Sequence, residues 1–316
     1  MTLSASQRQR WAEDGYLVIP GFFADAEVKA AIDELDRTWA VRPDDVTVDD
    51  LVTGQRKRAS QVDDADRDDH TFKVNDLYLV SEDVRSVALS ERVGAVLGEL
   101  LEDVPVMCNT LNLEKGSQQA DHLDTLYMTP KTPDKLVATW MALEDVHPDA
   151  GPLRYWPGSH RVDPYRFSTG SMHVVQDEMD QWVDHMATVV DRHGLEQQHF
   201  GANAGDLLIW HAWLLHGGSP ITDQNRTRNS LITHFWAQSD VADLGDLRPA
   251  PGGLWWHREP QPVAPTDEQT ATERALAEQS ADERAVTRVR EEPAAPPDGR
   301  EPGLFERMRR LVRSHG

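Results

Sequence analysis

The sequence predicts a mainly β protein of the sandwich, jelly-roll or barrel class, flanked by helices. Three observations favour this class. Short β-rich runs separated by Gly and Pro turns extend from about Phe72 to Trp236, two helical patterns precede them, and a polar stretch with helical periodicity interrupts them. Regularly spaced short strands with turn residues between them are typical of all-β sandwiches and barrels.

Two helices and one strand are expected before the β region. A helix over Ser4–Glu13 is followed by a short strand over Tyr16–Pro20 and by a second helix over about 24–39 with one apolar face. Residues 41–70 are rich in Asp and Arg and hold few apolar positions. That composition predicts a long loop.

The β runs carry the expected core. In chain order they are KVNDLYLV, VMCNTLNLE, LVATWMALEDV, DLLIWHAWLL and RNSLITHFW. A polar insertion between Arg161 and Gly205 includes a stretch with helical periodicity over 174–190. An insertion of this length beside a β core is a candidate lid.

The last part of the chain has a different composition. After Trp256 it is rich in Pro, Ala, Glu and Arg, with a helix expected from about Thr266 and a basic amphipathic helix over 303–316. The expected organisation is therefore a domain over 1–258, with its core at about 72–238, and a linker with a C-terminal helix over 259–316. That helix could dock on a partner or a membrane surface, but packing on its own acidic body or on a twin subunit is favoured, which makes a homodimer possible.

Charge and cysteine content exclude several function classes. The formal charge of -22 argues against a nucleic-acid partner and against an anionic membrane surface, because such proteins concentrate Lys and Arg on one face. Cys108 is the only cysteine, which excludes an internal disulfide and a Cys-based zinc site. No apolar run reaches the roughly 18 residues of a membrane span. The expectation is a cytoplasmic protein with a small-molecule substrate.

The stretch ADHLDTLYM contains a candidate metal pair. Side chains two residues apart on a β-strand share a face, so His122 and Asp124 could bind one ion while Leu123 faces away. A facial triad for non-heme Fe(II) needs a second histidine from elsewhere in the chain. His216, in LLHGGSP, and His211, five residues earlier, both qualify; strand alternation and the glycine pair after His216 favour His216.

The run RTRNSLITHFW contains a candidate anion site. Arg228 and Ser230 lie two residues apart among apolar residues, and a buried guanidinium requires an anion because it is always charged. A dicarboxylate co-substrate could supply that anion in a bidentate contact. The alternative is an ordinary salt bridge to one of the many acidic residues.

The ordered set of motifs GYLVIPGFF, KVND, HLD, GPLRYWPGSH, LLHGGSP and RNSLITHF resembles the phytanoyl-CoA dioxygenase family of Fe(II)/2-oxoglutarate oxygenases over roughly residues 8–238. The resemblance implies a double-stranded β-helix (jelly roll) core with flanking N-terminal helices, a helical insertion and a helical C-terminal tail. It also implies Fe(II), 2-oxoglutarate and O2 as cofactor and co-substrates, with His122, Asp124 and His216 as the iron ligands.

Further residues are carried over from the same resemblance. Arg228 matches the arginine that holds the distal carboxylate of 2-oxoglutarate, and Trp140 matches a tryptophan beside that co-substrate. Residues implied at the same pocket are Ser230, Lys73, Thr110, Leu111 and Asn112. Two positions depart from the family pattern, because Asp121 precedes the metal histidine and Gly218 replaces a hydroxyl residue.

The substrate side is expected to be aromatic and partly basic. Candidate wall residues are Tyr127, Arg154, Trp156, Trp210 and Trp213, although aromatic residues of this kind are at least as often plain core. The acidic protein favours a neutral, cationic or zwitterionic metabolite over a polyanionic thioester.

The resemblance implies hydroxylation as the default outcome, and retention of Asp124 argues against halogenation. We expect a substrate from specialised, natural-product metabolism. Desaturation or cyclisation would use the same cofactor chemistry. Two alternatives from other classes are a cupin-like metal-dependent isomerase or binding module, and a silent scaffold that works through its C-terminal helix.

Overall fold

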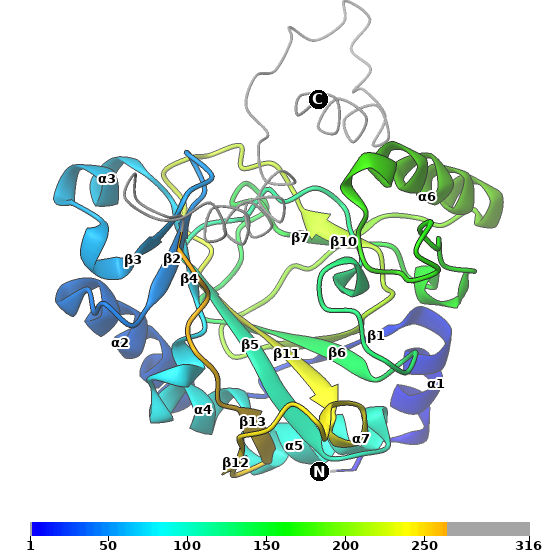
Figure 1. Ribbon diagram of the computed structural model, residues 1–316, viewed down its shortest axis with the longest axis horizontal. Coiled ribbons are helices and arrows are strands. Elements are labelled where there is room, and N and C mark those ends of the chain that lie inside the picture. The colour runs from blue at the N-terminus through cyan, green and yellow to red at the C-terminus, as the bar shows by residue number, and fades with distance from the viewer. Residues whose placement is uncertain (1, 264–316) are drawn as a thin grey trace, which may run out of the picture.

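The computed structural model describes residues 2–263, and two of the expected elements, the helix from about Thr266 and the basic helix over 303–316, lie outside these residues. In the described part, two β-sheets face each other and helices cover the outer face of the larger one (Figure 1). The prediction of a mainly β, jelly-roll-type core is confirmed, and none of the helices within residues 2–263 is long and apolar enough to cross a membrane.

The large sheet has the strand order β1-β9-β6-β11-β5-β4-β2-β3, extended by β13 and β12. All of its pairs are antiparallel except β13 with β5. Its strands are β1 (Tyr16–Ile19), β2 (Thr47–Asp50), β3 (Arg56–Arg58), β4 (Phe72–Asn75), β5 (Pro105–Leu113), β6 (Leu136–Ala142), β9 (Leu207–His211), β11 (Ser230–Ala237), β12 (Leu247–Ala250) and β13 (Gly253–Trp256).

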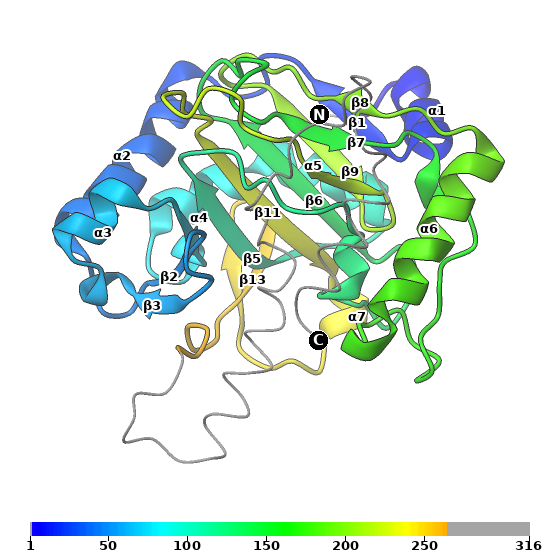
Figure 2. The same ribbon diagram turned by 90° about the horizontal axis from the view of Figure 1, so that it is seen from above.

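The small sheet has the order β10-β7-β8 and faces the inner side of the large sheet (Figure 2). Its strands are β7 (Leu153–Tyr155), β8 (Gln198–His199) and β10 (His216–Gly218). The helices are α1 (Ala5–Asp14), α2 (Asp25–Val41), α3 (Asp64–Asp69), α4 (Glu82–Ala88), α5 (Glu91–Leu101), α6 (Met179–His193) and α7 (Gln238–Val241).

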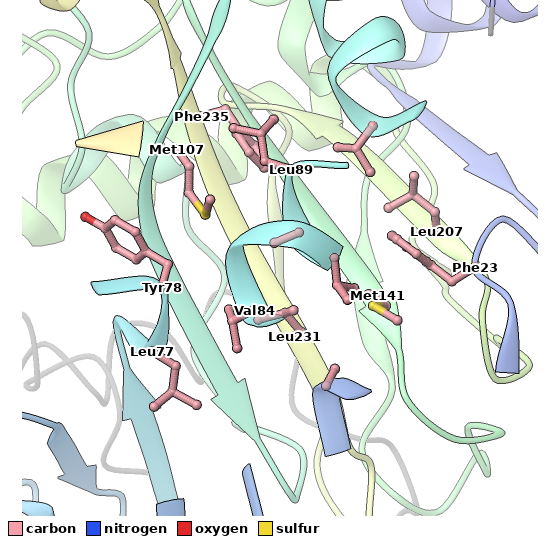
Figure 3. Packing of buried hydrophobic residues seen from close by; sticks show 14 of the residues in the cluster. Phe23, Leu77, Tyr78, Val84, Leu89, Met107, Met141, Leu207, Leu231 and Phe235 are labelled. Atoms are coloured by element: carbon pink, nitrogen blue, oxygen red, sulfur yellow. The ribbon is translucent and has the colours of Figure 1, made fainter. Parts of the chain in front are cut away.

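The strand register divides the large sheet into two faces. The helix-covered face carries apolar side chains that pack under α2, α4 and α5, among them Leu231, Met141 and Phe235 (Figure 3). The opposite face, here called the site face, carries Leu111, Ile232, Trp140, His234 and Trp210. Both faces are buried, so the strands read as nearly continuous apolar runs.

The N-terminal helices are where the sequence predicts them. Ser4 caps α1: its hydroxyl accepts from the backbone N–H of Gln7, whose side chain accepts in return from the N–H of Ser4. This is a capping box, which satisfies two otherwise unpaired donors at the start of the helix. Gly15 ends α1 in the left-handed region at φ 78°, and β1 begins at the next residue.

The prediction of a long loop over 41–70 is wrong. This segment contains β2, β3 and α3 and extends the large sheet. Its charged residues are buried in pairs: Asp49 contacts Arg56 at 2.6 Å and Lys73 at 2.9 Å. Because these charges neutralise one another inside the fold, composition alone gives no sign of burial.

Two further predictions need correction. The helices α4 and α5 lie within the region that the sequence suggested to be only β-rich. The expected helix over 174–190 exists as α6, but it begins at Met179 and ends at His193. It packs through Trp182, Val183 and Met186 on Leu123 and Leu215, which lie next to the candidate metal residues, as a lid would.

Candidate functional site

The candidate metal residues are brought together by the backbone. His122 and His216 form an isolated antiparallel bridge, with the N–H of His122 donating to the carbonyl of His216 at 2.8 Å and the reverse bond at 3.1 Å. Asp124 begins a 3-10 turn that ends at Leu126. The idea that His122 and Asp124 share one regular strand is therefore wrong; a bridge and a turn place them side by side.

The three side chains form one tight, buried set. Nε2 of His122 lies 3.8 Å from Oδ1 of Asp124, and Nε2 of His216 lies 3.5 Å from the same oxygen. One possible ligand atom from each residue lies within 4.8 Å of the others. This spacing suits three ligands of a single ion, with the remaining positions open to other groups.

Both histidines are held in the form that binds a metal. Nδ1 of His122 lies 2.8 Å from the carbonyl of Ala120, and Nδ1 of His216 lies 2.9 Å from that of Leu214. A carbonyl can only accept, so each Nδ1 carries the proton and each Nε2 directs its lone pair into the space that it shares with Oδ1 of Asp124, where a cation can bind. Burial, reinforced by His216, lowers the pKa of His122 to about 3, so this ring is neutral at physiological pH.

The Asp124 carboxylate is oriented by two further side chains. The indole N–H of Trp210 donates to Oδ2 at 2.8 Å, and Nε2 of His234 lies 3.5 Å from Oδ1. Burial alone would raise the pKa of Asp124, but the neighbouring His216 and His234 hold it below its usual value. A carboxylate that stays ionised is the form that binds a cation.

The sequence named two histidines as candidates for the second metal position, and of these the structure brings His216 beside His122 and Asp124. His211 ends β9 on the other side of the strand, where its Nε2 lies 3.1 Å from Oδ1 of Asp134. The apolar strand β9 thus ends at His211, and His216 begins the separate strand β10. A Cβ at Gly217 would lie 2.4 Å from Oδ1 of Asp121, so what this glycine allows is close approach to the segment before His122.

Arg228 is a fully buried cation near this set. It lies two residues before β11, not within it, and Nη1 donates to the carbonyl of Gly151 at 2.7 Å. Its guanidinium lies 5.6 Å from the centre of the Trp140 ring. Within residues 2–263 it has no carboxylate partner at ion-pair distance, and its Nε has no hydrogen-bond partner. Burial lowers its pKa to about 10.

Two neighbours of Arg228 also have unused polar atoms. The hydroxyl of Ser230 and the indole N–H of Trp140 are buried without a hydrogen-bond partner. Both residues lie on the site face, because Ser230 pairs with Ala142 and Ile232 pairs with Trp140 across β11 and β6. Buried donors without partners are rare in folded proteins. Together with Arg228 they form a donor-rich site that fits a carboxylate.

The structure separates the other residues expected at the co-substrate. Leu111 lies on the site face opposite Ile232, whereas Thr110 and Asn112 point to the helix-covered face. The hydroxyl of Thr110 accepts from the backbone N–H of Tyr78 at 3.3 Å. Lys73 is half-buried and in contact with Asp49. By register Lys73 also lies on the site face, because it pairs with Leu113 and Leu113 pairs with Ser230, so Leu111 and Lys73 stay on that face.

The residues expected at the substrate wall also differ in their surroundings. Tyr127 lies beside the metal set, with its ring 5.8 Å from that of His122. Trp156 packs in the apolar cluster under α6, and Arg154 contacts Asp121 at 2.5 Å. Trp210 holds Asp124, as described above. Trp213 lies against His211, at 5.9 Å between ring centres.

Sequence reasoning missed one residue beside the metal set. His234 lies on β11 two and four residues beyond Ile232 and Ser230, so all three share the site face. That i, i+2, i+4 spacing within SLITHF is a signal that could have indicated it.

Comparison of the sequence with known proteins identifies a family and a relative. The family model described as phytanoyl-CoA dioxygenase matches residues 11–229. The peroxisomal phytanoyl-CoA dioxygenase of Bos taurus is 23% identical over 247 residues, which cover 74% of this chain and 68% of that protein.

Several solved structures have the same fold as this chain. The epimerase SnoN, in complex with Fe3+, alpha ketoglutarate and nogalamycin RO, superposes with a TM-score of 0.54 at 20% identity, covering 83% of this chain and 95% of that one. EctD from S. alaskensis, with 2-oxoglutarate and 5-hydroxyectoine, superposes with a TM-score of 0.55 at 20% identity, covering 75% and 77%. At these identities the similarity establishes the fold alone.

Proposed function

The chain belongs to the phytanoyl-CoA dioxygenase family, and from this premise we propose that it is an Fe(II)- and 2-oxoglutarate-dependent dioxygenase. His122, Asp124 and His216 would hold the iron. Two neutral imidazoles and one carboxylate on one side of an ion are the donor set of non-heme Fe(II) oxygenases. When bound, the iron and 2-oxoglutarate would supply oxygen activation; the chain's own residues bind, orient and exclude water.

The observation that carries the proposal is the buried guanidinium of Arg228, which has no carboxylate at ion-pair distance among residues 2–263 and whose Nε has no hydrogen-bond partner there. A histidine and carboxylate set alone would fit several metals and reactions. A cation buried without an anion is costly, and a dicarboxylate ligand would supply that anion. We assign the distal carboxylate of 2-oxoglutarate to Arg228 and Ser230, with Trp140 and Leu111 lining the path toward Asp124.

The proposed reaction is hydroxylation of an unactivated C–H bond of a small metabolite or natural-product intermediate, giving succinate and CO2. Desaturation or cyclisation is the alternative outcome at the same site; the similar protein SnoN is described as an epimerase. α6 packs on Leu123 and Leu215 and would keep water from the metal set.

Turnover of 2-oxoglutarate tests this function. Purified protein supplied with Fe(II), 2-oxoglutarate and O2 should form succinate and CO2, and His216→Gln should abolish that activity. His211→Gln is the matched control, because it changes a histidine of the same sequence run that lies outside the metal set. Succinate formation that survives His216→Gln but not His211→Gln would contradict the assignment. Metal binding without any succinate, unaffected by Arg228→Met, would favour the cupin-like alternative.

The substrate is proposed by class only. The charge of -22 favours a neutral, cationic or zwitterionic metabolite. A domain over 1–258, a cytoplasmic location and a homodimer remain predictions from composition, and sedimentation of the purified full chain would test the last of them.

A further inference from the structure

One row of cross-strand neighbours continues the site face away from the metal set. Ile232 on β11 pairs with Leu111 on β5, and Leu111 pairs in turn with Asn75 on β4. Asn75 pairs with Thr47 on β2, which pairs with Arg58 on β3. Because residues directly opposite each other in a sheet share a face, all five residues of this row lie on the site face.

The far end of this row holds buried polar atoms without partners. Asn75 is 2% exposed and Thr47 is 1% exposed. Oδ1 and Nδ2 of Asn75, the hydroxyl of Thr47 and Nη1 of Arg58 are all buried and have no hydrogen-bond partner among residues 2–263. Buried polar groups of folded proteins are nearly always paired. A whole carboxamide left unpaired beside an unpaired hydroxyl therefore indicates a place where another molecule supplies the partners.

The surroundings of Leu111 show that solvent reaches this part of the site face. Leu111 is the only residue of β5 that is not buried. β5 lies inside the large sheet, between β4 and β11, and helices cover the other face of that sheet. The exposed area of Leu111 must therefore lie on the site face. A molecule over Leu111 would have Ile232 on one side and Asn75 on the other.

The position of Asn75 relative to the metal set fits a small metabolite. The carboxylate of Asp124 contacts Trp210 on β9 and lies near His234 on β11. Asn75 lies two strands beyond β11 in the other direction (Figure 1). Neighbouring strands are about 4.8 Å apart, which puts Asn75 about 10 Å from Ile232. A molecule anchored at Asn75 would thus extend across β5 toward the metal set.

The unpaired atoms specify the chemistry of the missing partner. Asn75 leaves both a donor and an acceptor unused, so the matching group must offer an acceptor next to a donor, as an amide or a vicinal diol does. A carboxylate offers acceptors only and would leave Oδ1 of Asn75 unpaired. The cations of the neighbouring row, Lys73 and Arg56, are already paired with Asp49, so they do not require an anionic ligand.

We infer that Asn75 and Thr47 form a subsite for the primary substrate, and that this subsite recognises an uncharged group with a hydrogen-bond donor beside an acceptor. Arg58 adds a further donor at the edge of the subsite, and Leu111 contacts the apolar part of the same molecule. The inference rests on the proposed function, because the subsite would anchor the molecule whose C–H bond faces the metal set.

Four small probes test the subsite in the full chain by saturation-transfer NMR. 2-Pyrrolidinone is an amide and cis-1,2-cyclopentanediol is a vicinal diol, whereas cyclopentanone offers one acceptor and cyclopentanecarboxylate offers acceptors with a charge. We expect the amide or the diol to bind at least about tenfold more tightly than the other two probes, and the tighter of them identifies the substrate class. No binding of the amide or the diol, or equal affinity for all four probes, would overturn the inference.

Two substitutions of similar shape locate the binding. Asn75→Leu and Thr47→Val should each weaken the bound probe about tenfold. Asn112→Leu is the matched control and should leave probe affinity unchanged, because Asn112 has the same two unpartnered atoms within residues 2–263 but lies on the helix-covered face. Replacing an unpaired buried polar group by an apolar one is neutral or stabilising, so the urea midpoints should not fall below that of the parent. Probe binding that survives both site-face variants, or lower midpoints in both, would contradict the subsite.

Failure of the subsite can be told from failure of the proposed function. Saturating 2-oxoglutarate should leave probe binding unchanged, because Arg228 and Ser230 lie outside this row. If 2-oxoglutarate displaces the probe, Asn75 belongs to the co-substrate site, and the subsite falls while the function stands. If the parent binds the probe through Asn75 but forms no succinate, the ligand site stands and the proposed function falls.

Discussion

Replacing Arg228 by methionine should strongly weaken 2-oxoglutarate binding without destabilising the folded protein. The guanidinium is fully buried, and its pKa falls from 12.5 to about 10 because of that burial. At about 1.4 kcal/mol per pKa unit, keeping this charge inside the apo-protein costs about 3 kcal/mol. Methionine has a similar length and no charge, so this cost disappears.

Part of that gain is offset. The variant loses the hydrogen bond from Nη1 to the carbonyl of Gly151, which is worth about 1 kcal/mol. We therefore expect the apo-protein of Arg228→Met to be about 2 kcal/mol more stable than the parent. Urea denaturation of both proteins without ligands measures this difference.

Binding should change in the opposite direction. Removing one partner of a buried, hydrogen-bonded charge pair costs about 2–5 kcal/mol, which weakens 2-oxoglutarate binding by about 30-fold to several thousand-fold. Fe(II) or Co(II) affinity should stay within about threefold, since Arg228 is no metal ligand. Arg226→Met is the control, because Arg226 lies two residues away but is exposed and paired with Asp223.

The reasoning would be refuted by a clear pattern. If Arg228→Met binds 2-oxoglutarate as tightly as the parent and as Arg226→Met, the buried cation does not serve that ligand. If the variant instead loses several kcal/mol of stability, Arg228 is a structural residue whose partner is the protein itself.

Three further predictions concern the metal set and the extended sheet. Asp124→Ala removes one of three ligands and should weaken Co(II) binding by more than about 100-fold, since even supporting residues cost about 10- to 100-fold; absorption titration checks this. Gly217→Ala places a Cβ 2.4 Å from Oδ1 of Asp121 and should lower the free energy of unfolding by about 1–3 kcal/mol in urea denaturation. Asp49→Asn should lower the free energy of unfolding by about 3–5 kcal/mol, because it breaks the buried ion pairs of Asp49 with Arg56 and Lys73. Burial alone would raise the pKa of Asp49, but Lys73 and Arg56 lower it below its usual value. The contribution of the Asp49 carboxylate to the free energy of unfolding is therefore present above pH about 4 and is lost as the pH falls below that value. The parent should therefore lose more stability on acidification than Asp49→Asn does.

The fold class could be predicted because β runs and turns are local features. Alternation and Gly or Pro punctuation indicated β5, β6, β9 and β11, whose side chains make both buried faces of the sheet. The strands β2 and β3 were missed because Asp49 and Arg56 neutralise each other in the interior. Such pairing depends on tertiary contacts that composition does not encode.

The candidate site could be predicted only in part. The pattern at His122 and Asp124 indicated a metal pair. The two residues do not share a regular strand, however; an antiparallel bridge between His122 and His216 brings the two histidines together. The face on which Thr110 lies depends on register within β5, and a one-residue difference reverses it. His234 was missed because its contact with Asp124 joins residues more than a hundred positions apart.

The central claim is that one buried site binds both iron and 2-oxoglutarate. The most direct measurement is an anaerobic titration of the full-length apo-protein with Fe(II) and then with 2-oxoglutarate, followed by visible absorption. We expect a weak charge-transfer band to appear when 2-oxoglutarate is added, and Arg228→Met to require far more of it. Iron binding without any band at saturating 2-oxoglutarate would contradict the account.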